Sequence, residues 1–183
     1  MIEIQVYATS VARSIPFEIY WVLLGLCLVG SLVLIWWKGV RLGLRYCTTL
    51  LLAEWTLLIL CATVIFRETN NERGYNLIPF ESYFNYGTQS YFLEMFGENI
   101  LNVLLFVPIG FLAGCGLQRM TWKKVLILGG GYSVLIELLQ FIFKKGFCET
   151  DDIIHNVLGC IIGYGLWRAV SYVPIRKRTR EQV

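Results

Sequence analysis

Acidic and amide side chains interrupt strongly apolar stretches in the second half of the chain. Glu137 and Gln140 are three residues apart, and Asp152 and Asn156 are four apart, so each pair would share one face of a helix. Inserting a carboxylate near the middle of a membrane costs about 2.5–3.5 kcal/mol. Two such groups brought together could work as a general acid and a general base. Glu137 and Asp152 are therefore the catalytic candidates of this sequence.

Other polar residues have spacings that would add them to the same group. As a ligand-binding cluster the candidates are Asn76, Asn99, Asn102, Glu137, Gln140, Asp151, Asp152, His155 and Asn156. Each has a simpler interpretation as well. Aspartates that open a helix favour its dipole and can cap it, and a lone histidine can be an interfacial aromatic residue. Buried amides can join neighbouring helices, at about 0.6 kcal/mol each.

The sequence indicates no cofactor and no standard metal site. It has one histidine and no C-x-x-C pair, and it lacks the G-x-S-x-G and H-E-x-x-H motifs. A divalent cation held by Glu149, Asp151 and Asp152 is a variant of the catalytic hypothesis. Glu54, in the middle of another apolar stretch, has no local partner, and both a structural and a functional role remain open for it.

The composition is that of a membrane protein. Of 183 residues 56% are hydrophobic and 16% are charged, whereas soluble domains carry about 25% charged residues. A helix needs about 20 apolar residues to cross a membrane. Five stretches qualify, at about 17–37, 45–66, 98–117, 125–143 and 152–173. The sequence predicts an all-α, polytopic bundle of about five transmembrane helices, forming a single membrane domain over 1–183. No clustered basic face suggests a nucleic-acid partner.

Basic residues predict how the bundle is oriented. Connections 38–45 and 118–124 and the tail after 167 are basic, whereas 67–97 and 144–151 are mixed or acidic. The positive-inside rule then places the N-terminus outside and the C-terminus in the cytoplasm. With this orientation the polar candidates lie together just below the outer surface.

Glycine pairs and an apolar connection in the sequence predict how the helices and the loop pack. Gly110 with Gly114, and Gly159 with Gly163, form small-x-x-x-small faces that predict close helix approach. The connection 67–97 contains NLIPFESYFNY, which is too apolar to extend freely into water. We expect it to fold back over the outer end of the bundle, with Pro79 and Phe80 near the stretch 98–117.

Four motifs in order resemble the VanZ-like family of small membrane proteins. They are NLIPF at 76–80, NILNVLLFVPIGF at 99–111, IELLQ at 136–140 and ETDDIIHNVLGCIIGY at 149–164, which together cover about 75–165. The family is named after a protein associated with resistance to the glycopeptide teicoplanin. By motif, the resemblance implies that most of the polar candidates are family positions. Lys144, Lys145 and Glu149 stand where the family often has an arginine and an aspartate.

Two functions remain open. The resemblance and the missing nucleophile favour a multi-pass protein of the bacterial cell membrane that contacts membrane lipid. It would bind a lipid-linked cell-wall precursor or a glycopeptide at the outer face. The alternative is a membrane-embedded enzyme that acts on a lipid-linked substrate through Glu137 and Asp152. A transporter is disfavoured because the chain has no internal repeat.

Overall fold

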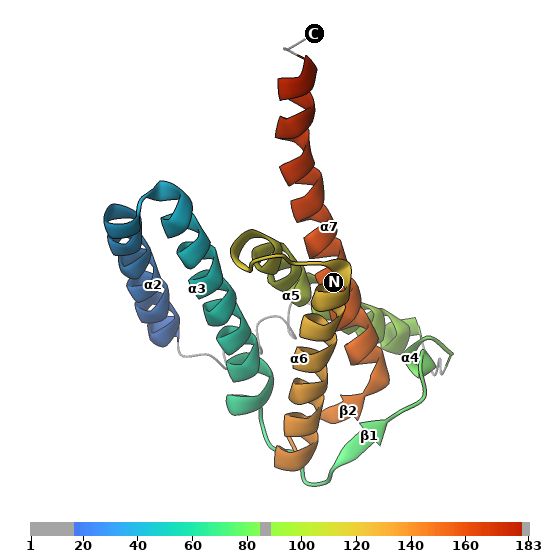
Figure 1. The fold of residues 1–183 in the computed structure, drawn as a ribbon. Coiled ribbons are helices and arrows are strands. Elements are labelled where there is room, and N and C mark those ends of the chain that lie inside the picture. Colours follow the sequence, from blue (N-terminus) through green and yellow to red (C-terminus); the bar gives the residue numbers. More distant parts are fainter. Residues whose placement is uncertain (1–16, 85–88, 181–183) are drawn as a thin grey trace.

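The computed structural model describes residues 17–84 and 89–180 (Figure 1). The elements are α2 (Phe17–Lys38), α3 (Val40–Leu60), the π-helical turn η1 (Cys61–Ile65), β1 (Gly74–Asn76), α4 (Glu81–Phe84), α5 (Gln89–Gly116), α6 (Trp122–Phe143), β2 (Phe147–Glu149) and α7 (Thr150–Arg180). The predicted bundle of long apolar helices is confirmed. The two short strands were not predicted.

Four helices in the described part of the chain are long and apolar enough to cross a membrane. They cover Gly43–Ile65, Met95–Gly116, Trp122–Phe143 and Thr150–Tyr172. The predicted first span, 17–37, coincides with the helix α2, but only part of its side chains are described. A fifth membrane crossing and the orientation of the termini therefore stay predictions.

The helices extend beyond the apolar stretches that predicted them. Helix α5 begins at Gln89 rather than at 98, and α7 continues to Arg180. Apolar composition marks only the part of a helix suited to lipid, whereas backbone hydrogen bonds can carry the helix further. The second stretch ends differently, because η1 closes it with a bond from Phe66 N to Cys61 O of 2.9 Å.

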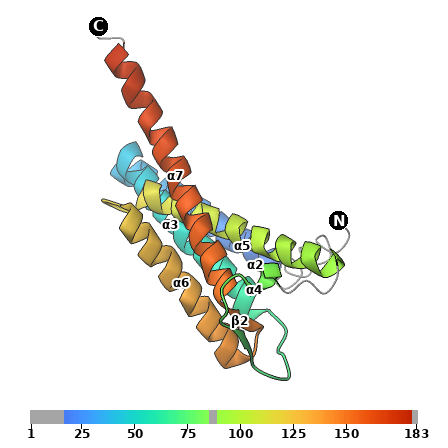
Figure 2. The ribbon, with the colours of Figure 1, turned by 90° about the vertical axis from the view of Figure 1, so that its right-hand side faces the viewer.

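Glycine lets α5 and α7 cross in close contact (Figure 2). An added Cβ would strike the Cys160 carbonyl from Gly110 and the Val107 carbonyl from Gly163. On Gly159 it would strike a third backbone carbonyl of the facing helix. The predicted small-residue faces are thus confirmed, and backbone touches backbone along this seam.

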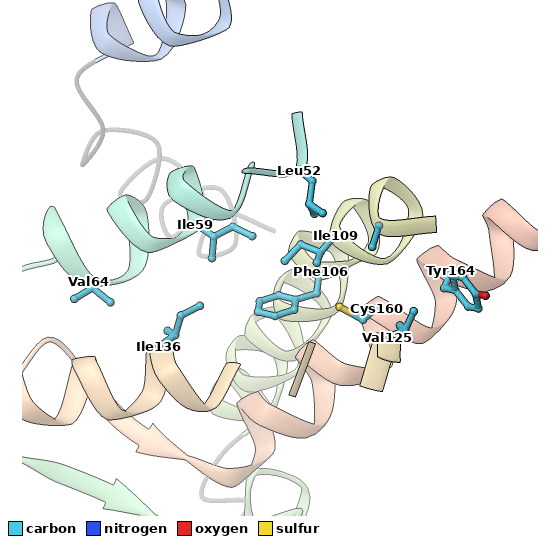
Figure 3. Packing of buried hydrophobic residues seen from close by; sticks show 10 residues of the cluster. Leu52, Ile59, Val64, Phe106, Ile109, Val125, Ile136, Cys160 and Tyr164 are labelled. Atoms are coloured by element: carbon cyan, nitrogen blue, oxygen red, sulfur yellow. The ribbon is translucent and has the colours of Figure 1, made fainter. Parts of the chain in front are cut away.

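Buried apolar side chains from α3, α5, α6 and α7 fill the interior of the bundle (Figure 3). Phe106 and Ile109 of α5 are 1% and 0% exposed, and Cys160 of α7 is completely buried. At the far end of this core Tyr164 packs edge-on against Trp122, with ring centroids 4.7 Å apart, and donates a hydrogen bond of 2.8 Å to Met120 O.

Two connections come together where α6 ends and α7 begins (Figure 1). Strands β1 and β2 pair in parallel, with Gly74 opposite Phe147 and Asn76 opposite Glu149. The long connection folds back onto the bundle, where Phe80 N donates to Asp151 Oδ1 of α7 at 2.5 Å. Its predicted position at the outer end stays a prediction, as does the approach of Pro79 and Phe80 to the stretch 98–117. We call residues 66–84 and 144–149 the connecting lobe.

Candidate functional site

One face of α6 carries three buried polar side chains. Ser133, Glu137 and Gln140 are spaced by four and three residues, and all three are buried. Glu137 is 2% exposed, and its Oε2 accepts a hydrogen bond of 2.8 Å from Glu149 N. That N–H directly precedes α7, so the Glu137 carboxylate lies at the positive end of that helix.

The first turns of α7 join this face of α6 to α5. Asp152 Oδ1 accepts from Asn102 Nδ2 of α5 at 2.7 Å. One turn later, Asn156 Nδ2 donates to Ser133 Oγ of α6 at 2.9 Å. Each polar residue of α7 thus reaches a different neighbouring helix. Ser133 was missing from the predicted set, although its position four residues before Glu137 could have identified it.

The connecting lobe is fastened to α7 by a second group of contacts, which we call the loop latch: Phe80, Tyr83, Asp151 and His155. His155 Nδ1 lies 2.6 Å from Asp151 O, and Nε2 lies 2.7 Å from the Tyr83 hydroxyl oxygen. A carbonyl only accepts, so Nδ1 carries a proton, and in a neutral ring Nε2 accepts from Tyr83. His155 is buried, which distinguishes it from an interfacial aromatic residue that faces the headgroups.

The Cys148 thiol lies outside the membrane-spanning segments, in β2. Burial raises the pKa of this thiol, and the negative charges of Glu137, Asp152 and Glu149 raise it further. Both catalytic candidates therefore act electrostatically on this thiol. Because the raised pKa disfavours the thiolate, Cys148 is a weak nucleophile.

The pKa of the Glu149 carboxyl is also raised by its surroundings. Burial raises the pKa of its carboxyl and Asp151 adds to the increase, while the Arg67 guanidinium opposes it and Glu81 reinforces it. Arg67 is thus the cation that acts on this carboxyl. It was missing from the predicted set, which looked for a positive charge next to the paired aspartates in the sequence.

Local backbone geometry makes room for Arg67. Gly146 has a φ of 146°, and a Cβ at this position would lie 2.9 Å from the Arg67 Cζ. Lys144 and Lys145, which stand at the family's arginine position, bind backbone instead. Their ammonium groups donate to Asn71 O at 3.2 Å and to Arg67 O at 2.6 Å.

Two other candidate amides bind backbone groups. Asn76 Oδ1 accepts from Ile78 N at 3.2 Å and so closes a turn within the connecting lobe. Gln140 Nε2 donates to Thr63 O in η1 at 3.2 Å. A π-helical turn displaces the usual backbone bonding pattern, and Gln140 binds a carbonyl within it. Asn99 is buried on α5, 6% exposed.

Some buried oxygen atoms of the described residues have no hydrogen-bond partner. They are Gln140 Oε1, Asn156 Oδ1 and, on α3, Glu54 Oε1. Among the same described residues, no group of three His, Cys, Asp or Glu side chains is arranged to hold a metal ion. The suggested cation ligands Asp151 and Asp152 instead accept from two different donors, Phe80 N and Asn102 Nδ2.

Comparison with known proteins identifies the family of this chain. The model of the VanZ/LLP1 family matches residues 46–171. The chain belongs to the VanZ/LLP1 family. The matched VanZ/LLP1 region runs from α3 into α7 and contains all the polar residues described above, including Arg67 and Ser133. It is longer than the region 75–165 that the four motifs cover.

One curated VanZ/LLP1 relative is Protein VanZ of Enterococcus faecium, which is 29% identical over 97 residues. The match covers 53% of this chain and 54% of that protein, so the chain spans about half the length of this relative. No solved structure matches the chain.

Proposed function

We propose that this VanZ/LLP1 protein binds the polar part of an amphiphilic or lipid-linked ligand at the outer face of the bacterial cell membrane. In doing so it would contribute to resistance against glycopeptides such as teicoplanin, or against cell-envelope stress. The observation that carries the proposal is the group of buried and half-buried carboxylates where α6 ends and α7 begins, next to the loop latch. The resemblance to the VanZ-like family supports the connection with resistance.

The cost of these carboxylates argues for a role beyond packing. Glu137 is buried in a mostly apolar helix, where a charge is expensive to keep. The glycine seam between α5 and α7 already holds two helices together without polar side chains. Polar groups that assembly does not need are therefore candidates for contact with a ligand.

A membrane-embedded enzyme is the second candidate function. It is favoured because Glu137 accepts from Glu149 N, directly before the helix that carries Asp152, and two neighbouring carboxyls can exchange protons with a substrate. The weak nucleophilicity of Cys148 disfavours a covalent mechanism through that thiol. Acid–base chemistry on a bound lipid-linked substrate remains the form that this alternative takes.

The test uses two changes that keep shape and remove charge, Glu137→Gln and Asp152→Asn. Cells that express each variant are tested for teicoplanin susceptibility, and the purified proteins are tested for binding of teicoplanin and of lipid II. Both variants should lose protection and binding while membrane level and melting temperature stay normal. Glu72→Gln, at an exposed acid of the connecting lobe, is the matched control and should behave as wild type.

The outcomes separate the hypotheses. Full protection by both variants would remove the carboxylates from the function. Conversion of lipid II by the wild-type protein, lost in both variants, would establish the enzyme instead of the binding protein.

The proposed outer location needs its own test. A single cysteine at Asn71 of the connecting lobe, in a chain without native thiols, should react with a membrane-impermeant reagent in intact cells. A cysteine at Lys123, near the start of α6, should react only after the membrane is opened. The reverse pattern would place the carboxylate group on the cytoplasmic side.

A further inference from the structure

We propose that the connecting lobe is seated in the interfacial layer of the membrane, with lipid as the partner of its exposed apolar side. The side chains concerned, which we call the apolar rim, are Tyr75, Leu77, Ile78, Phe80, Phe84 and Phe147, which are 68%, 62%, 62%, 46%, 79% and 56% exposed. A concentration of large apolar side chains this exposed marks a contact surface. This inference does not depend on which ligand the protein binds.

Polar and apolar residues are separated within the lobe. Residues 68–73, with the sequence ETNNER, are all exposed. The apolar rim begins two residues later, at Tyr75, and continues to Phe84. A segment with one polar side and one apolar side is typical of structures that lie in the membrane plane.

The apolar rim lies next to an exposed apolar surface of a helix that could cross the membrane. Helix α6 is suited to cross the membrane, and its side chains Leu138 and Phe143 are 51% and 55% exposed. Phe147 follows Phe143 by four residues, and β-pairing places Gly74 opposite Phe147. Tyr75 projects from the other face of the strand pair, and its ring centroid lies 6.4 Å from that of Phe141 on α6. Both strands lie beside the end of α6 (Figure 1), so Tyr75 and Phe147 stand next to the exposed apolar end of that helix.

The backbone N–H groups of residues 78–81 in the lobe are all hydrogen-bonded, which suits an environment with little water. Ile78 N donates to Asn76 Oδ1 at 3.2 Å, and Glu81 N donates to Ile78 O at 3.3 Å. Phe80 N donates to Asp151, as described above, and Pro79 has no N–H. Every N–H that residues 78–81 possess is therefore bonded. Full satisfaction of backbone donors is what burial against lipid requires.

The same backbone limits how deep the lobe can lie. Strands β1 and β2 form a sheet of two strands, so each keeps an edge without a neighbouring strand. Open sheet edges do not occur in contact with lipid in the hydrocarbon core, where they would leave donors and acceptors unbonded. Aromatic side chains also favour the interface between lipid and water. The headgroup layer satisfies both conditions.

Depth measurements by electron paramagnetic resonance test this inference. Nitroxide labels are placed one at a time at Leu77, Ile78 and Phe84 in the full chain without native thiols, reconstituted in phosphatidylcholine–phosphatidylglycerol vesicles. Relaxation by oxygen reports exposure to lipid, and relaxation by a water-soluble nickel chelate reports exposure to water. We expect oxygen to be severalfold the more effective relaxant at all three positions.

Two label positions calibrate the result. Leu138, on the exposed face of α6, gives the response of a side chain in lipid, and Asn71 gives the response of one in water. The three rim labels should lie between these values and closer to Leu138. Nickel accessibility equal to that of Asn71 would overturn the inference. Low accessibility to both relaxants would overturn it too, because the rim would then be covered by a protein partner or a second copy.

Discussion

The two ends of the α5–α7 pair are held together by opposite means. At one end, Gly110 and Gly163 let backbone touch backbone. At the other end, Asn102 and Asp152 join the same two helices through a hydrogen bond between side chains. Helices in lipid associate through close packing rather than through hydrophobic burial, so glycines suffice for assembly.

This difference predicts which substitutions affect folding and which affect activity. The glycine end contains no costly group, and its shape leaves little room for change. The polar end keeps carboxylates in surroundings that disfavour them, and each is partly compensated by a donor from another segment. Substitutions at the glycine end should therefore act on folding. Substitutions at the polar end that preserve shape should act on activity before they act on folding.

The largest expected effect is at the glycine end. Gly163→Leu would drive a side chain into the backbone of α5 at Val107, which cannot move aside. Overpacking of this kind costs about 3 kcal/mol or more. We expect a strongly lowered melting temperature in detergent, or no folded protein in the membrane. The control is Gly131→Ala on α6, where an added Cβ meets nothing within 4 Å.

In the Gly131 control, alanine should stabilise the helix by about 0.5–1 kcal/mol. Equal melting temperatures for the two glycine variants would show that the seam is not close-packed, and the comparison between the two ends would fail.

A smaller effect is expected when the polar end loses a donor. Asn102→Ala removes the hydrogen bond to Asp152 and leaves that carboxylate without its amide partner. The cost of an unpaired buried group is about 1–3 kcal/mol. Thermal unfolding in detergent should show this loss, whereas Asn71→Ala, at an exposed position, should not change the melting temperature. An unaffected Asn102→Ala protein would mean that Asp152 does not depend on this contact.

The parts of the molecule that could be predicted from the sequence are those with a local signal. Apolar stretches predicted the helices, and spacings of three and four predicted the buried face with Glu137 and Gln140. Strands of three residues leave no comparable pattern, and the pairing of 74–76 with 147–149 joins segments far apart in the chain. Arg67 escaped notice for the same reason.

For Asn76 the sequence motif predicted a role that the structure does not show. Its motif placed it in the polar group, yet its side chain closes a turn at Ile78. Motif membership cannot distinguish a residue that shapes a loop from one that contacts a ligand, because both depend on a particular side chain at a particular place.

The loop latch should contribute less than either helix contact. Tyr83→Phe removes the hydroxyl that lies 2.7 Å from His155 Nε2, and a hydrogen bond of this kind contributes about 0.5–1.5 kcal/mol. Hydrogen exchange of the amides at 80–84 should become faster, while exchange within α5 and α7 stays unchanged. Tyr75→Phe is the control, because Tyr75 is an exposed tyrosine of the same lobe. Equal exchange in both variants would show that the lobe is held by other contacts.

The smallest expected effect is a pH dependence that originates at Glu149. Burial and the neighbours Asp151 and Glu81 raise the pKa of its carboxyl above the ordinary value of 4.5, against the opposing charge of Arg67. Above pH 4.5 the folded state therefore keeps a proton that the unfolded state has lost. The free energy of unfolding must then fall as the pH rises through this range, until the folded state loses the proton too.

Glu149→Gln imitates the protonated carboxyl at every pH and should remove this contribution. The melting temperature of the variant, measured in detergent from pH 4.5 upward, should decrease less with pH than that of the wild-type protein. The difference between the two curves reports Glu149 together with the effect of its charge on the neighbouring carboxyls. Parallel curves would mean that Glu149 has the same proton affinity in the folded and unfolded states. Glu149 would then contribute no pH dependence to the melting temperature, as is expected of the glycine end.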